Sequence, residues 1–165
     1  MTNDNNKTSQ TKTAIFTMGL PASGKSTVAN ETYDMAALVV VDPDLFKESH
    51  PAYDANDPGA LHGWSNERAE ELITATFAEG VSDIFIDGTG VNAEKMVRRM
   101  NQAKAAGYST EILYVKVDLA VALQRNAERP RTVPTHVLTE KARDITTSFE
   151  IASKHADKVT VIDNN

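Results

Sequence analysis

The chain has 165 residues, of which 41% are hydrophobic and 24% charged, so it can bury a core within one domain of ordinary size. Its 17 basic and 23 acidic residues give a net charge of −6, and an acidic chain is a poor general binder of nucleic acid. It has no cysteine, which excludes disulfides, thiolate catalysis and cysteine-ligated zinc. No apolar run approaches the roughly 18 residues of a membrane span, and residues 1–12 lack the apolar segment of a secretory signal. We therefore expect a flexible N-terminal tail at residues 1–12, one domain at residues 13–165, no membrane contact and a cytoplasmic location.

Strand and helix patterns alternate along the domain. Short apolar runs predict strands at residues 13–18, 37–41, 83–87, 111–117 and 158–162. Amphipathic patterns predict helices at residues 25–35, 65–79, 92–106, 119–127 and 135–156. Ser65 and Asn92 are the expected caps of two of these helices, and residues 37–41 (ALVVV) have the composition of a strand buried on both faces. The alternation predicts an α/β fold in three layers, with a five-stranded parallel sheet and helices on both faces.

A glycine-rich loop follows the first predicted strand. Residues 19–26 (GLPASGKS) match the pattern G-x-x-x-x-G-K-[ST] of the P-loop NTPases, with an apolar strand before it and a helical pattern after it. In such a loop the backbone N–H groups and the helix N-terminus bind phosphates, the lysine reaches the β- and γ-phosphates, and the hydroxyl binds Mg²⁺. The pattern predicts that ATP is bound by Gly19, Ala22, Ser23, Gly24, Lys25, Ser26 and Thr27, with Mg²⁺ on Ser26.

Carboxylates follow two predicted strands at the edge of the sheet where ligands bind. Asp42 and Asp44 come after residues 37–41, and Asp87 ends the run Ile-Phe-Ile in the form of a Walker B acid that holds Mg²⁺ directly or through water. Either Asp42 or Asp44 can instead cap the turn at residues 45–48. Residues 87–90 (DGTG) also fit the D-x-x-G of GTPases, but no Asn-Lys-x-Asp or Thr-Lys-x-Asp follows a later strand, so guanine selection is not encoded in the usual way.

Three arginines gather in a proline-containing loop. Arg125, Arg129 and Arg131 are typical of a lid that closes over ATP, where guanidinium groups stabilise the charge of the transferring phosphoryl group. The alternative is a solvated charged turn. His62 and Trp64 could touch a substrate, although a tryptophan more often packs in the core. The pair at residues 98–99 has the pattern of a solvated helix face.

The motifs taken together resemble the zeta-toxin family over about residues 13–162. The resemblance rests on residues 19–27 (GLPASGKST), on residues 42–47 (DPDLFK) followed by His50-Pro51, and on residues 87–89 (DGT). Zeta toxins are P-loop kinases that phosphorylate a hydroxyl of UDP-N-acetylglucosamine and related nucleotide sugars. The resemblance implies that Asp44 is the general base and that Asp87 is the acid near Mg²⁺, and it places on the substrate side Asp42, Lys47, Thr89 and Asn92. The arginine that usually follows the G-T of zeta toxins is replaced here by Gly90-Val91-Asn92.

The same chain also resembles phage-type polynucleotide 5′-hydroxyl kinases. That likeness runs from residues 87–92 (DGTGVN) through Arg125-Asn126 and Arg129 to Val133-Pro134, and it implies that Arg129 is the lid arginine. The leading hypothesis is a zeta-toxin-like, ATP- and Mg²⁺-dependent kinase, catalysed by Lys25, Asp44, Asp87 and Arg129, with an antitoxin as a possible partner. The alternatives are a kinase of a polynucleotide 5′-hydroxyl, nucleotide or modified DNA base, and a P-loop protein that holds ATP without transfer.

Overall fold

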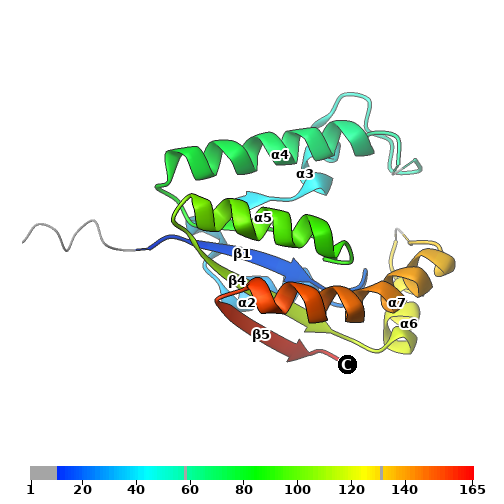
Figure 1. Ribbon diagram of the computed structural model, residues 1–165. Helices are drawn as coiled ribbons and strands as arrows, with labels where there is room; N and C mark the ends of the chain where they lie inside the picture. Colours follow the sequence, from blue (N-terminus) through cyan, green and yellow to red (C-terminus); the bar gives the residue numbers. More distant parts are fainter. Residues whose placement is uncertain (1–10, 58, 131) are drawn as a thin grey trace, which may run out of the picture.

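The central sheet has five parallel strands in the order β2-β3-β1-β4-β5 (Figure 1). The computed structural model describes residues 11–57, 59–130 and 132–165. Its strands are β1 (Thr13–Met18), β2 (Val39–Val41), β3 (Ile84–Ile86), β4 (Ser109–Lys116) and β5 (Lys158–Asp163). The predicted five-stranded parallel sheet is confirmed. Most of the predicted tail lies outside the described residues, and the domain boundary at residue 13 stays a prediction.

Helices cover both faces of this sheet, which confirms the three layers (Figure 1). The helices are α2 (Lys25–Thr32), α3 (Pro43–Ser49), α4 (His62–Glu79), α5 (Ala93–Ala105), α6 (Leu119–Ala127) and α7 (Thr135–Ala152), with 3₁₀ turns η1 (Met35–Ala37) and η2 (Ser153–His155). Because successive side chains of a strand point to opposite faces, Ile15 packs with Val28 of α2, whereas Phe16 packs with α4, α5 and α7.

Three local predictions are wrong. The run at residues 37–41 is not a strand buried on both faces: η1 takes its start, and β2 is an edge strand whose Val39 and Val40 are only half-buried. Helix α4 begins at His62 rather than at Ser65, so Ser65 lies inside the helix and its hydroxyl donates to the His62 carbonyl. Helix α2 ends at Thr32, because Tyr33 is extended and its ring packs on Phe85.

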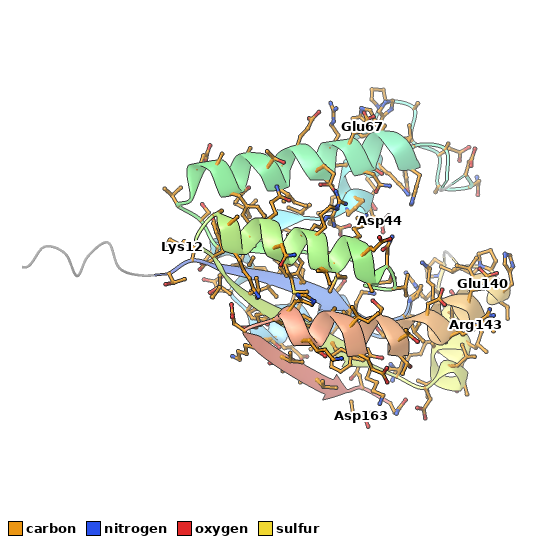
Figure 2. All side chains as sticks on the ribbon, in the orientation of Figure 1. Lys12, Asp44, Glu67, Glu140, Arg143 and Asp163 are labelled. Carbon is orange, nitrogen blue, oxygen red and sulfur yellow. The ribbon has the colours of Figure 1, made fainter. Side chains whose placement is uncertain are left out.

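The strand order brings the sequence motifs to one edge of the sheet. The phosphate loop follows the central strand β1, residues 87–90 follow its neighbour β3, and Asp42 follows the edge strand β2. Backbone hydrogen bonds tie these loops together, from Gly19 N to Thr89 O at 3.0 Å and from Asp87 N to Val41 O at 2.9 Å. Figure 2 shows Asp44 on this side of the molecule, toward which the arrow of β1 points.

Candidate active site

The phosphate loop has the backbone conformation that its glycines were expected to supply. Gly24 has a φ of 90°, and a Cβ atom there would lie only 2.5 Å from Nδ2 of Asn164. The Lys25 ammonium curls back over the loop, with Nζ 3.1 Å from the Gly19 carbonyl oxygen. Burial lowers the pKa of Lys25, although the charge of Asp87 opposes that shift. The Lys25 ammonium is therefore partly desolvated, and a bound phosphate would stabilise its charge.

Arg125 and Asn164 hold the loop through its backbone. Asn164 Nδ2 donates to the Ser23 carbonyl oxygen at 2.8 Å, and Arg125 Nη1 approaches the same oxygen at 3.4 Å. Arg125 Nη2 also donates to the Asn164 carbonyl oxygen at 2.7 Å. The contacts of Arg125 are thus with the loop backbone and with the segment after β5. Its direct contact with ATP stays a prediction.

A cavity of about 870 Å³ opens beside the loop. It is lined by most of the residues singled out from the sequence, namely residues 22–27, Asp42, Asp44, Lys47, Asp87, Thr89, Asn92 and Arg129. Gly19 contributes through the carbonyl that holds Lys25. Arg125 is not among the lining residues, and Arg131 lies outside the described residues. The structure thus brings together the predicted phosphate, acid and lid residues, while their individual roles stay predictions.

Asp87 is fixed by a buried threonine that the sequence did not single out. The Thr17 hydroxyl lies 3.2 Å from Asp87 Oδ1 and accepts a hydrogen bond of 2.9 Å from the Gly88 N–H. Thr17 is only 1% exposed. The same hydroxyl lies 2.9 Å from the Gly88 carbonyl oxygen, so Thr17 contacts both the Asp87 carboxylate and the backbone that follows it.

Asp42 caps a helix and also lines the cavity. Its carboxylate caps α3 by accepting from the Asp44 N–H at 2.9 Å, and it lines the cavity. Burial and the negative charge of Asp87 raise its pKa from the usual 3.8 to about 6. The two carboxylates therefore repel each other, and a cation between them would be stabilised.

The donor set fits Mg²⁺. Mg²⁺ is usually held by one or two carboxylates together with waters and substrate phosphates. The cavity offers the Ser26 hydroxyl and the carboxylates of Asp87 and Asp42. Among the described residues no group of three or more His, Cys, Asp or Glu side chains is arranged to hold a metal alone, so phosphate oxygens would complete the coordination.

The raised pKa of Asp42 predicts a pH-dependent stability. The neutral carboxyl is favoured in the fold, so its stabilisation is present below pH 4 and is lost as pH rises through about 6. Asn keeps the helix cap without the charge. We expect Asp42→Asn to stabilise the ligand-free protein by about 2 kcal/mol at pH 7.5, and by much less at pH 4.5. Urea unfolding at both pH values measures this. The exposed Glu48→Gln on the same helix should show a much smaller dependence, because the charge of Glu48 is the weakest of the causes that raise the pKa of Asp42. An equal gain at both pH values would contradict the prediction.

Next to Asp44, a buried lysine contacts a histidine. Lys47 is 6% exposed, and its Nζ lies 3.9 Å from Asp44 Oδ1 and 3.0 Å from Nδ1 of His62. Burial, followed by the charge of Lys47, lowers the pKa of His62. The neutral imidazole can therefore accept from the Lys47 ammonium. His62, weighed from the sequence only as a possible substrate contact, lines the cavity, whereas Trp64 packs edge-on against His50.

Three cations of the cavity were missed from the sequence. Lys95, Arg99 and Lys141 all line it. The prediction of a solvated face at residues 98–99 is wrong for Arg99, which is 9% exposed and bonded to Glu70. The spacing along the helices could have indicated two of them. Arg99 lies seven residues after Asn92, and so on the same face of α5. Lys141 lies three residues after the buried Leu138, and so on the buried face of α7.

The loop that carries Arg129 is closed by one buried side chain. The amide of Asn126 donates to the Val133 carbonyl at 2.7 Å and accepts from the Val133 N–H at 2.8 Å. Asn126 is 5% exposed. The pair of bonds fixes both ends of the loop while Arg129 lines the cavity.

Removing the two hydrogen bonds between Asn126 and Val133 is expected to loosen the loop. Asn126→Ala leaves two partly buried polar groups of Val133 without their partner, at a cost of about 1–3 kcal/mol. We expect a lower melting temperature and faster trypsin cleavage after Arg131. Glu128→Ala, an exposed change in the same turn, is the control for both measurements. Unchanged cleavage in Asn126→Ala would show that the two bonds do not hold the loop.

The family follows from a comparison over most of the chain. A family model described as an AAA domain, AAA_33, matches residues 15–151. The chain belongs to the AAA_33 family. This AAA_33 protein is thus a P-loop, kinase-like domain, in agreement with its strand order and phosphate loop.

Curated relatives of this AAA_33 chain include toxins and a kinase. It is 24% identical to toxin zeta of Streptococcus pyogenes over 136 residues, which cover 77% of this chain and 47% of the toxin. It is 26% identical to the L-seryl-tRNA(Sec) kinase of Methanococcus maripaludis over 129 residues, which cover 75% of this chain and 49% of that kinase. The chain therefore spans about half the length of the curated relatives it matches.

Solved structures confirm the fold of this AAA_33 domain. The PezAT toxin–antitoxin system of Streptococcus pneumoniae contains a chain that matches 92% of this one with a TM-score of 0.73 and 17% identity, over 68% of its own length. The Pnkp1/Rnl/Hen1 RNA repair complex contains another, matching 90% of this chain with a TM-score of 0.69 and 16% identity, over 48% of its length. Both structures thereby confirm the fold that the two resemblances implied. In the part of the chain that the structure describes, no helix has both the length and the apolar character needed to cross a membrane.

Proposed function

We propose that this protein is an ATP- and Mg²⁺-dependent kinase that phosphorylates a hydroxyl of a nucleotide-sugar type of acceptor. One observation carries the proposal: the phosphate-loop lysine Lys25 and the strand-end acids Asp42, Asp44 and Asp87 line one cavity. A protein that only holds ATP needs no carboxylate on the acceptor side. The likeness to toxin zeta supports the sugar-nucleotide class of acceptor.

The roles follow from what the side chains can do. Asp44 takes the proton of the acceptor hydroxyl, whose oxygen then bonds to the γ-phosphorus while the bond to the β–γ bridging oxygen breaks and ADP leaves. Lys25 and Arg129, joined by Lys141, stabilise the charge of the phosphoryl group. Ser26 and Asp87 would hold Mg²⁺, which when bound neutralises charge on the phosphate oxygens.

The test uses γ-labelled ATP and Mg²⁺ with two acceptors in parallel, UDP-N-acetylglucosamine and a 5′-hydroxyl oligonucleotide. Label on the sugar nucleotide supports the proposal. Label on the oligonucleotide alone would replace the acceptor class while keeping the kinase. Bound ATP without transfer to any acceptor would favour the third hypothesis, a binding protein.

The main rival is a kinase whose acceptor hydroxyl is carried by RNA or DNA. The likeness to an L-seryl-tRNA(Sec) kinase favours it. The net charge of −6 speaks against a long polyanion as substrate. If an oligonucleotide is the acceptor, its binding should weaken steeply with added salt, whereas binding of a small sugar nucleotide should change far less.

The likeness to a chain of the PezAT toxin–antitoxin system is the reason to propose an antitoxin-type protein partner. If the protein is a toxin, expression of the wild type should arrest growth, and expression of Lys25→Met should not. Equal growth with both would remove the reason to expect an antitoxin.

A further inference from the structure

The cations of the cavity form two separate groups. The charges that act on Lys25 come from Arg129 and Lys141, together with Asp42 and Asp87. These residues surround the phosphate loop, so this group is accounted for by ATP. The second group lies on the wall formed by α4 and α5.

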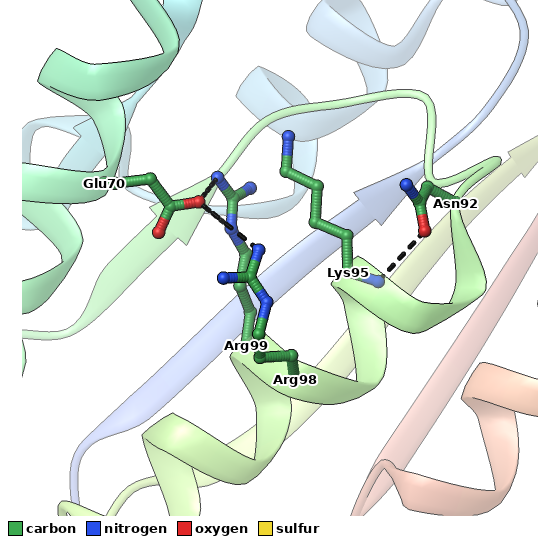
Figure 3. A network of polar contacts seen from close by, with 5 residues as sticks. All are labelled: Glu70, Asn92, Lys95, Arg98 and Arg99. Atoms are coloured by element: carbon green, nitrogen blue, oxygen red, sulfur yellow. Dashed lines mark hydrogen bonds and ion pairs between the residues drawn. The ribbon is translucent and has the colours of Figure 1, made fainter.

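The second group consists of Lys95 and Arg99. The charges that act on Lys95 come from Arg99, Glu70 and Arg98, none of which is among those acting on Lys25. Figure 3 shows Arg98 and Arg99 reaching from α5 toward Glu70 of α4, while Lys95 extends from the first turn of α5. The Asn92 side chain caps this helix by accepting from the Lys95 N–H at 3.0 Å. The cap fixes the first turn of α5, and so the backbone from which Lys95 extends.

Glu70 holds Arg99 against the cavity wall. Its Oε1 atom accepts from Arg99 Nη2 at 2.6 Å and from Nε at 3.2 Å, and it lies 3.8 Å from Arg98 Nη2 (Figure 3). Arg98 is 64% exposed and does not appear among the residues lining the cavity, whereas the side chain of Arg99 is 11% exposed and does line it. One carboxylate is thus shared by two guanidinium groups.

Lys95 adds a third positive charge to this network, in which Glu70 is the acidic partner of Arg98 and Arg99. It lines the cavity, and it forms no side-chain hydrogen bond or ion pair with the residues that the structure describes (Figure 3). Burial, and then the charge of Arg99, lowers its pKa, against the attraction of Glu70. A half-buried ammonium beside a guanidinium is unfavourable unless an anion joins them. This wall therefore has an excess of positive charge directed into the cavity.

The position of this wall relates it to the acceptor. Helix α4 joins the two regions. Its His62 lies 3.0 Å from Nζ of Lys47, which lies 3.9 Å from Asp44, and its Glu70 accepts hydrogen bonds from Arg99. Lys95 and the proposed base therefore lie on the same side of the cavity. An anionic group held there would belong to the acceptor rather than to ATP.

We propose that Lys95 and Arg99 bind a phosphate group that the small-molecule acceptor already carries, and so select phosphorylated acceptors over neutral ones. This rests on the proposed kinase function. The Arg99 guanidinium supplies directed N–H donors, and Lys95 supplies a point charge, the two modes by which proteins bind phosphate.

The experiment keeps the phosphate loop occupied. Protein saturated with Mg²⁺ and a non-hydrolysable ATP analogue is titrated calorimetrically with pyrophosphate, with neutral N-acetylglucosamine and with a 5′-hydroxyl oligonucleotide. We expect pyrophosphate to bind, and Lys95→Met to weaken that binding by about 10-fold or more, as the loss of a charge-assisted contact implies. Arg98→Met, in the same network but outside the cavity lining, should bind pyrophosphate as the wild type does. Arg99→Lys keeps the positive charge but removes the guanidinium donors, so its affinity for pyrophosphate should lie between those of the other two variants.

The outcomes separate the two proposals. Failure of the ATP analogue to bind would overturn the kinase proposal itself. Normal binding of the analogue, with pyrophosphate binding that is absent from the wild type or unchanged in Lys95→Met, would overturn the phosphate site alone. A dependence on Lys95 seen only with the oligonucleotide would overturn the small-molecule acceptor. Lys95→Met removes an unpaired, desolvated charge, so its melting temperature should not fall, and an unchanged value makes the titration interpretable.

Discussion

Asp44→Asn is expected to lower the rate of phosphoryl transfer by about 10²–10⁴-fold while leaving the affinity for ATP unchanged. The Asp44 side chain is exposed, lines the cavity and lies on the acceptor side, where Lys47 Nζ stands 3.9 Å away. An amide has nearly the same shape but cannot take the proton of a hydroxyl. Asn at this position also remains compatible with the first turn of α3, so the fold should be intact.

Glu48→Gln is the matched control for this variant. Glu48 lies four residues further along the same helix, is also exposed and also lines the cavity. Its neutralisation removes an equal charge from the same wall, so it should lower transfer only slightly. Single-turnover transfer measures the rate, and titration with a fluorescent ATP analogue measures affinity. Full transfer by Asp44→Asn, or equal losses in both variants, would show that Asp44 is not the base.

Lys25→Met is expected to abolish transfer, with a loss of about 10³-fold or more in kcat/KM. A cation that neutralises the γ-phosphate in the transition state contributes on that scale. The stability of the ligand-free protein, in contrast, should not fall in this variant. Since burial lowers the pKa of Lys25, removal of its desolvated ammonium should leave the melting temperature unchanged or raise it.

The two effects are separated by melting curves with and without Mg²⁺ and ATP. Wild type should gain stability from the ligand in proportion to its occupancy, and Lys25→Met should lose most of that gain. Lys104→Met, an exposed lysine in the last turn of α5, is the control and should behave as wild type. A Lys25→Met protein that keeps both the ligand-induced gain and the transfer rate would place the γ-phosphate elsewhere.

The phosphate loop and the strand-end acids could be predicted because each depends on a local pattern. A glycine-rich turn after an apolar strand fixes where Lys25 lies, and the parallel sheet brings Asp42 and Asp87 to the same edge. Both inferences needed only the order of elements and the hydrophobic period. Neither inference depended on the exact ends of the helices, which were predicted with errors of several residues.

The rest of the site depends on contacts between residues far apart in the chain. Glu70 precedes Arg99 by 29 residues, and nothing local in either helix indicates that they meet. Arg125 belongs to a pattern typical of a lid, yet its hydrogen bonds go to Ser23 and Asn164, 102 and 39 residues away. Burial of a charged side chain is decided by the partner that neutralises it, and the sequence does not name that partner.

The hydrogen bond from Asn164 to the Ser23 carbonyl has a practical consequence for work with this protein. A label attached to residue 165 would lie next to a side chain that supports the nucleotide loop. Figure 2 shows Lys12 on the opposite side of the molecule from Asp44 and Asp163. Fluorophores and surface tethers therefore belong near Lys12, on the side of the molecule away from the candidate active site.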